Sequence, residues 1–180
     1  MPFNLLMTHC LVNVTSWNDS PTSPKISFEP KSNEKIFFFS IDVDKEVDPR
    51  YQFRKHYNLV NENICDLIIY YINFKEGRRL LLFTEIKGKD LNHAHKQLET
   101  TYNAVINHGD FDDFCKSGCY ARVSVGLLAV SDRIQTSNLN SSHKKWKRCI
   151  KQSSKYKGST PEIIDIHPKN FEAAIRQLAQ

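Results

Sequence analysis

The sequence lacks any long hydrophobic run: no stretch approaches 18 uninterrupted apolar residues, so no transmembrane helix is expected. Its first residues, Met1-Pro2-Phe3-Asn4, also lack the positively charged region of a secretion signal. These two absences predict a soluble, cytoplasmic protein that has no membrane partner.

Cysteine is scarce and scattered. The five cysteines, an odd number, are spread from Cys10 to Cys149 and do not form the pattern of a disulfide framework. Reduced thiols fit a cytosolic compartment. Cys115 and Cys119, with His108 nearby, have no second matching pair downstream, whereas a structural zinc site needs four closing ligands. Buried or incidental thiols are therefore expected in place of a zinc site.

A strong charge imbalance is absent as well. The chain has 25 Lys and Arg against 20 Asp and Glu, a formal net charge of +5, which is compatible with a polyanionic partner without being diagnostic. Its 180 residues fit a single domain, and a chain of this size buries about 70% of its unfolded surface. We expect one domain over 1–180, with its core at about 35–135.

The most informative stretch is an apolar hairpin with charged ends. Two runs of strand length, 65–71 and 79–88, flank a polar turn that contains a glycine. The midpoint between Asp66 and Glu85 falls inside that turn, so an antiparallel hairpin places these two residues opposite each other at its open end. Side chains alternate along a strand, so Glu85 and Lys87 share a face. The sequence thus predicts that two carboxylates and one ammonium group converge.

This combination favours one kind of chemistry. Converging carboxylates at the rim of an apolar hairpin are costly unless something neutralises them. Mg²⁺ prefers oxygen ligands and commonly takes one or two carboxylates, which leaves positions for water and a substrate phosphate. A lysine beside the metal can orient or deprotonate the attacking water and offset charge on the phosphorus oxygens. The set suits phosphodiester hydrolysis assisted by Mg²⁺ or Mn²⁺.

Asp66, the apolar hairpin, Glu85-Ile86-Lys87 and a following helix with Gln97 resemble the PD-(D/E)XK nuclease superfamily. The resemblance implies the restriction-endonuclease-like fold, an α/β fold with a mixed central sheet flanked by helices. It implies that Asp66 and Glu85 bind the metal, that the backbone carbonyl of Ile86 adds a ligand, and that Lys87 serves the nucleophilic water. Gln97 would support these catalytic groups.

The resemblance covers roughly residues 60–130 and departs from the superfamily pattern at two positions. Thr101 stands where the RecB-like branch has a tyrosine after the glutamine, and Tyr102 comes one residue later. Cys65 replaces the usual proline before the first aspartate. A second Glu-x-Lys at 29–31 contains a proline and follows no long apolar strand, so we interpret it as chance.

Further elements surround the hairpin. A strong strand is expected at 35–44, and its Asp42 and Asp44 share a face, either as an additional carboxylate of the site or as a solvated strand end. Asp90 is a good N-cap for a helix at 91–108. That helix separates the hairpin from an apolar strand at 120–130, which favours a parallel crossover. A strand and a helix are expected between 162 and 179.

Two basic stretches are candidates for contact with nucleic acid. In one, at 49–63, basic and aromatic residues alternate, which suits backbone phosphates and stacked bases. In the other, a helical segment at 143–157, seven of the fourteen residues from Lys144 to Lys157 are basic. The alternatives are an ordinary amphipathic turn and a solvated helix face. The predicted contacts are Arg54, Lys55, Lys144, Lys145, Lys147, Arg148 and Lys151.

The sequence therefore predicts a metal-dependent nuclease that acts on nucleic acid, with DNA the preferred substrate, in defence, restriction or repair. One alternative is a binding or assembly module that keeps the nuclease fold without turnover. Another is a metal-dependent enzyme that acts on a small nucleotide, which needs a closed pocket. The sequence does not decide between exonuclease and endonuclease action. It also leaves open a homo-oligomeric state and activation by a partner protein.

Overall fold

The structure is a computed structural model that describes residues 2–18, 20–21, 23–87, 90–109, 123–134 and 161–179. Its helical segments are α1 (Pro2–Leu5), η1 (Leu6–Cys10), α2 (Tyr51–His56), α3 (Leu91–Ile106), η3 (Pro168–Asn170) and α6 (Phe171–Leu178). Its strands are β1 (Leu11–Val12), β2 (Ser16–Trp17), β3 (Ile26–Ser27), β4 (Glu34–Ser40), β5 (Leu67–Asn73), β6 (Arg78–Ile86), β7 (Val123–Val130) and β8 (Ile163–Ile166).

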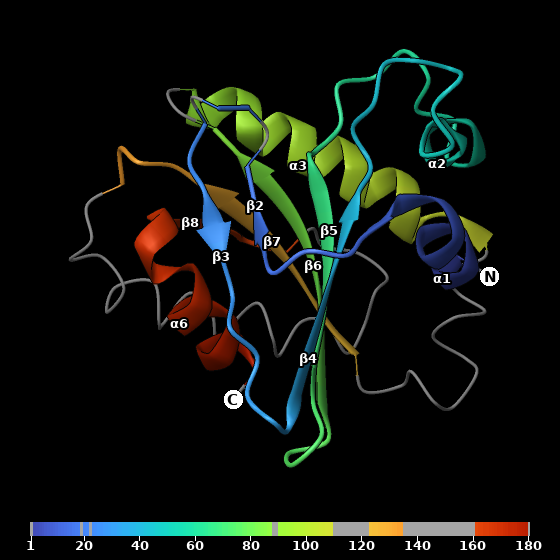
Figure 1. Cartoon of the computed structure of the whole chain (residues 1–180). Coiled ribbons are helices and arrows are strands. Elements are labelled where there is room, and N and C mark those ends of the chain that lie inside the picture. The colour runs from blue at the N-terminus through green and yellow to red at the C-terminus, as the bar shows by residue number, and fades with distance from the viewer. Residues whose placement is uncertain are drawn as a thin grey trace.

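A six-stranded mixed sheet forms the centre, with the strand order β1-β4-β5-β6-β7-β8. The first four strands in that order pair antiparallel, whereas β6, β7 and β8 run parallel. Helix α3 covers one face, and α6 covers the other together with the small β2-β3 sheet (Figure 1). This arrangement confirms the predicted mixed α/β class.

Two apolar layers fill the spaces on either side of the sheet. Because side chains alternate along each strand, Phe83 of β6 packs under α3, while Leu82 packs toward α6. Both side chains are fully buried, and burial of such a side chain stabilises the fold by about 1.5–3 kcal/mol. The nearly continuous apolar sequences of β5, β6 and β7 follow from this burial on both faces.

The hairpin has the predicted register. Leu67 pairs with Thr84 and Asn73 pairs with Arg78, which leaves a short turn where Gly77 has a φ of 64°, a conformation that favours glycine. The predicted helix and crossover are also confirmed. The Asp90 side chain accepts a hydrogen bond from the His93 amide at 3.0 Å, and α3 leads from β6 to the parallel β7.

Some predicted bounds are wrong. The strand expected at 35–44 ends at Ser40, so Asp42 and Asp44 follow the sheet instead of belonging to it. The described part of the strand expected at 120–130 is Val123–Val130. The basic stretch at 143–157 lies outside the described residues, as do Cys115 and Cys119. In the part of the chain that is described, no helix is both long and apolar enough to cross a membrane.

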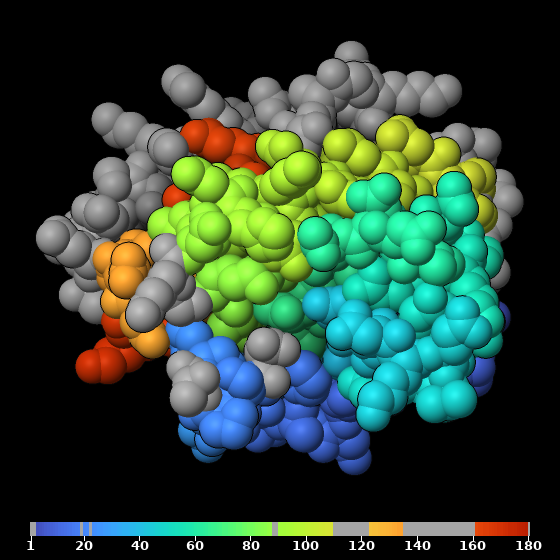
Figure 2. Space-filling view, turned by 90° about the horizontal axis from the view of Figure 1, so that it is seen from above, coloured from blue at the N-terminus to red at the C-terminus, as the bar shows by residue number. Residues whose placement is uncertain are grey.

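The end of the sheet opposite the hairpin turn is where several segments meet. Viewed from above in Figure 2, the start of α3 in light green lies beside the blue-green segment that contains α2 and the chain before β5. The blue N-terminal segment borders the same end. The open end of the hairpin, with Asp66 and Glu85, lies at this end of the molecule because its turn lies at the other.

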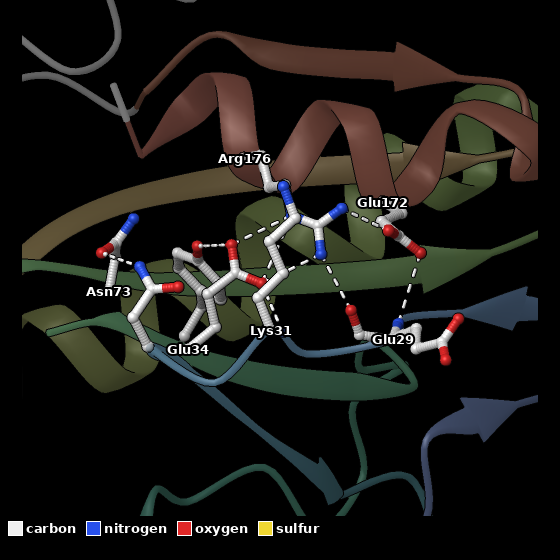
Figure 3. Close-up of polar contacts among 8 residues, drawn as sticks. Glu29, Lys31, Glu34, Asn73, Glu172 and Arg176 are labelled. Carbon is white, nitrogen blue, oxygen red and sulfur yellow. Dashed lines mark hydrogen bonds and ion pairs between the residues drawn. The ribbon is translucent and has the colours of Figure 1, made fainter. Parts of the chain in front are cut away.

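Helix α6 is joined to the first residue of β4 by an ion pair and to the chain before β4 by a hydrogen bond. We call β2, β3 and the chain up to β4 the N-terminal arm. Arg176 of α6 binds Glu34 through contacts of 2.9, 3.0 and 3.3 Å, and it donates a hydrogen bond to the carbonyl of Glu29 at 2.8 Å (Figure 3). The same guanidinium pairs with Glu172, and Tyr71 donates to Glu34 at 2.8 Å. This Arg176 cluster fixes the arm against α6.

Candidate active site

Asp66 and Glu85 lie opposite each other at the open end of the hairpin, as the sequence predicts. The main-chain amide of Asp66 donates to Glu85 Oε2 at 2.9 Å, and the amide of Ile86 donates to Asp66 Oδ2 at 2.7 Å. The side chains therefore bridge the two strands just beyond their last regular pair. Asp66 is 4% exposed and Glu85 is fully buried, so both carboxyl groups are removed from bulk water.

Lys87 completes the set at the solvent boundary. Its Nζ lies 2.8 Å from Glu85 Oε1, and its side chain is 31% exposed. Its main-chain amide donates to the carbonyl of Val130 at 2.9 Å, which continues the alignment of β6 with β7 past the end of the strand. The Lys87 ammonium group thus lies between the fully buried Glu85 carboxylate and the solvent.

Burial dominates the electrostatics of this set. It raises the pKa of Glu85 from 4.5 to about 7, although the hydrogen bond and charge of Lys87 act in the opposite direction. The negative charge of Asp42 contributes to the rise, which shows that Asp42 lies near the same set. Burial thus disfavours the ionised form of Glu85, and a cation bound beside it would favour that form.

Asp42 is held by a buried arginine. Arg54 is 5% exposed, and its guanidinium donates to the carbonyls of Leu59 at 3.1 Å and Glu62 at 2.7 Å while it pairs with Asp42. Burial raises the pKa of Asp42, with Arg54 opposing this effect. A guanidinium committed in this way cannot also contact a phosphate backbone. We therefore remove Arg54 from the predicted nucleic-acid contacts and assign it a structural role.

Lys55 remains available at the surface. Its side chain is exposed, and its Nζ lies 5.5 Å from the centroid of the Tyr51 ring. Its contact with nucleic acid stays a prediction. The other predicted contacts, Lys144, Lys145, Lys147, Arg148 and Lys151, lie outside the described residues.

Gln97 and Thr101 hold the main chain that leads into Asp66. Gln97 Nε2 donates to the carbonyl of Ile64 at 2.8 Å, and Thr101 Oγ1 accepts from the amide of Cys65 at 2.9 Å. Thr101 in turn donates to the carbonyl of Gln97 at 2.8 Å. Gln97 therefore contacts the main chain at Ile64, two residues before Asp66. Its Oε1 is buried and has no hydrogen-bond partner among the residues that the structure describes.

The sequence interpretation noted Thr101 only as a departure from a family pattern and missed its contact. A usable signal was present, because residues four apart on a helix lie on the same face. Gln97 and Thr101 have that spacing, and both are buried toward the segment before β5. A polar residue four positions after a candidate site residue on a helix is thus a reason to expect that both contact the same segment of the chain.

The donor atoms of this set are all oxygen, which hard divalent cations prefer. Within the described ranges, no group of three or more His, Cys, Asp or Glu side chains is arranged to hold a metal. Mg²⁺ and Mn²⁺ do not need such a group, because one or two carboxylates with water and substrate oxygens are sufficient. Asp66, Glu85 and the carbonyl of Ile86 offer only oxygen, and a buried carboxylate with a raised pKa gains from a nearby cation. The residues therefore fit Mg²⁺ or Mn²⁺.

The fold and site together define a mixed α/β protein with two buried carboxyl groups and a lysine at the end of a central hairpin. No protein-family model matches this chain, and no curated protein or solved structure is significantly similar to it.

Proposed function

We propose that this protein is a metal-dependent nuclease of the PD-(D/E)XK superfamily with a restriction-endonuclease-like fold. It hydrolyses phosphodiester bonds in nucleic acid, with DNA the preferred substrate. The observation that carries the proposal is the juxtaposition of Asp66 and Glu85 across two central strands, with Lys87 Nζ 2.8 Å from the buried Glu85 carboxylate. A functional site that needs two carboxylates and an ammonium group would explain why this apolar hairpin ends in charged residues.

Each residue has a role in the proposed reaction. Asp66, Glu85 and the carbonyl of Ile86 would hold Mg²⁺ or Mn²⁺, which supplies a polarised phosphoryl group and an activated water when bound. Lys87, at the solvent boundary, donates hydrogen bonds from Nζ to the attacking water and to the phosphorus oxygens, whose negative charge grows during the reaction. Gln97 fixes the main chain before Asp66 and so limits the movement of that carboxylate.

One observation favours a module with the same fold but without turnover. Asp66 Oδ2 and Glu85 Oε2 both accept main-chain hydrogen bonds, and Glu85 Oε1 pairs with Lys87. The two oxygens with main-chain donors are therefore satisfied by the protein alone, whereas Glu85 Oε1 is buried and has only the ion pair with Lys87. The main-chain bonds are compatible with a purely structural link between β5 and β6. In that case the protein would bind nucleic acid or assemble on it without cutting.

A cleavage assay separates the two candidates. Wild type, Lys87→Ala and Lys75→Ala are incubated with linear, circular and single-stranded DNA and with RNA, in Mg²⁺, in Mn²⁺ or in chelator. Lys75 is the matched control because it is exposed in the turn at the other end of the same hairpin. Circular dichroism checks that all three proteins fold.

The proposal predicts cleavage by wild type and Lys75→Ala in metal, with loss in chelator and in Lys87→Ala. Binding without cleavage under every condition would support the silent module. Degradation of a mononucleotide without cleavage of any polymer would instead support an enzyme that acts on small nucleotides. Cleavage that persists in Lys87→Ala would show that the chemistry resides elsewhere.

A further inference from the structure

The proposed reaction needs a group that takes the proton of the attacking water. Asp66 and Glu85 are assigned to the metal, and the Lys87 ammonium group has donors only, so none of the three accepts that proton. A general base is a side chain within hydrogen-bond reach of the water. Asp42, which lies near the same set, is the candidate for this role.

The main chain places Asp42 beside Asp66. The amide of Ile41 donates to the carbonyl of Asp66 at 3.1 Å, which continues the pairing of β4 with β5 past their last regular pair. Asp66 in turn lies opposite Glu85, so Ile41, Asp66 and Glu85 form one row across three strands. Neighbouring strands are about 4.8 Å apart, so this row spans about 10 Å. Asp42 is the next residue along the chain after the row.

The Asp42 side chain lies on the same face of the sheet as Glu85 and Lys87. Helix α2, which holds the partner of Asp42, contributes Phe53 to the apolar layer beneath α3. Phe83 belongs to the same layer, and Glu85 follows it by two residues on β6. The charge of Asp42 acts on Glu85, and the charge of Lys87 acts on Asp42, which agrees with one shared face. In Figure 2 the segment that contains α2 borders the start of α3 at this end of the molecule.

One oxygen of the Asp42 carboxylate is fixed, and the other is available. Arg54 donates to Oδ1, and its guanidinium is itself held by the carbonyls of Leu59 and Glu62. Oδ2 has no hydrogen-bond partner among the residues that the structure describes. The side chain is 33% exposed, close to the 31% of Lys87, so water reaches both groups. The carboxylate is thus oriented by the protein and open to water.

The surroundings of Asp42 also favour proton uptake. Burial raises the pKa of Asp42, and the negative charge of Asp44 adds to the rise, whereas the charges of Arg54 and Lys87 act in the opposite direction. Glu85 is a further charged group that interacts with Asp42. A carboxylate with a raised pKa is a stronger base near neutral pH than an ordinary aspartate.

We propose that Asp42 is the general base of the candidate active site. The inference rests on the proposed function and adds a catalytic residue to it. The proton of the attacking water moves to Asp42 Oδ2 while the water oxygen forms its bond to phosphorus. The bond between phosphorus and the leaving ester oxygen breaks, its electron pair stays on that oxygen, and a solvent water protonates it. Asp42 then releases its proton to solvent.

The test compares DNA cleavage by wild type, Asp42→Asn, Asp42→Ala and Asp44→Asn. Asp42→Asn removes the base but keeps an oxygen for the buried guanidinium of Arg54, so its fold should be preserved. Asp42→Ala leaves room for a small carboxylate from solution. Asp44→Asn is the matched control, because it removes the same charge from an exposed side chain 3.8 Å from the same guanidinium. Circular dichroism and thermal melting check the fold of each variant.

The loss of a general base lowers the rate of a reaction by about 10²–10⁴-fold. We expect a loss of this size in kcat for Asp42→Asn, with KM unchanged and with wild-type affinity for DNA in chelator. Asp44→Asn is expected to keep the wild-type rate. Added formate should restore part of the rate of Asp42→Ala, because a free carboxylate can replace the missing base, and should leave the rate of Asp44→Asn unchanged.

The outcomes separate this inference from the proposed function. A wild-type rate in Asp42→Asn, when wild type cleaves DNA in metal, overturns the general base and leaves the nuclease intact. An equal loss in Asp44→Asn, or a loss confined to KM, also overturns it, since either result assigns the effect to charge or to binding. The same holds for a folded Asp42→Ala that formate does not restore. A wild type that cleaves nothing overturns the proposed function and the general base together.

Discussion

The ion pair between Arg176 and Glu34 makes a quantitative prediction about stability. Glu34 is 7% exposed, and its pKa is lowered from 4.5 to about 2, chiefly by its hydrogen bonds with Arg176. The difference of about 2.5 between these pKa values corresponds to on the order of 3 kcal/mol of folding free energy. We therefore expect Arg176→Met to lower the free energy of unfolding by about 3 kcal/mol.

Urea unfolding of Arg176→Met, Glu34→Gln and the double variant measures the coupling between the two side chains. The pKa of Glu34 is lowered in the folded state, so its contribution is fully present above about pH 4.5 and is lost as the pH falls toward 2. The stability of wild type should decline over that window, and that of Arg176→Met should decline less. A coupling energy under about 0.5 kcal/mol, or equal acid sensitivity in the two proteins, would refute the reasoning.

Three further predictions concern the candidate site. Lys87→Met is expected to raise the pKa of Glu85 above about 7, because the ammonium group opposes the effect of burial. NMR titration of the Glu85 side-chain carboxyl group measures this pKa. A lower pKa in the variant than in wild type would contradict the prediction. The raised pKa also means that the stabilising contribution of Glu85 is present below about pH 4.5 and is lost as the pH rises through about 7. Glu85→Gln should therefore flatten the pH dependence of unfolding in that window, and an unchanged profile would argue against a titrating Glu85. Thr101→Val keeps the methyl group, leaves the amide of Cys65 without its acceptor and should cost about 1–3 kcal/mol in urea unfolding, whereas Thr101→Ser keeps the hydroxyl group and should cost less. A loss in Thr101→Ser as large as that in Thr101→Val would contradict the role given to the hydroxyl group.

The sequence predicted the pairing of Asp66 with Glu85 because a hairpin is a local structure. The position of the turn sets which residues face each other, and the alternation of side chains then sets the face. The N-cap at Asp90 was also predictable, since its partner lies only three residues away. In each case the information lies within a short stretch of chain.

Features that depend on distant partners were not predictable in this way. Arg54 lies among basic and aromatic residues, which suggested a nucleic-acid surface, yet its guanidinium is buried by contacts with two carbonyls and Asp42. The strand expected to reach residue 44 ends at Ser40, where the chain leaves the sheet. A cleft of about 440 Å³ between the N-terminal arm and the start of α6 combines segments more than 100 residues apart, such as those of Lys25 and Asp132, and no local sequence pattern predicts it.

The Arg176 cluster has a practical consequence for work with shortened versions of the chain. Helix α6 supplies Phe171, Ile175 and Leu178 to one of the two apolar layers, and its arginine holds the N-terminal arm. A protease cut or a deletion before α6 would therefore uncover β3 and the β4–β5 surface as well as removing the last helix. Affinity tags and truncation boundaries should be chosen so that both chain ends keep this mutual support.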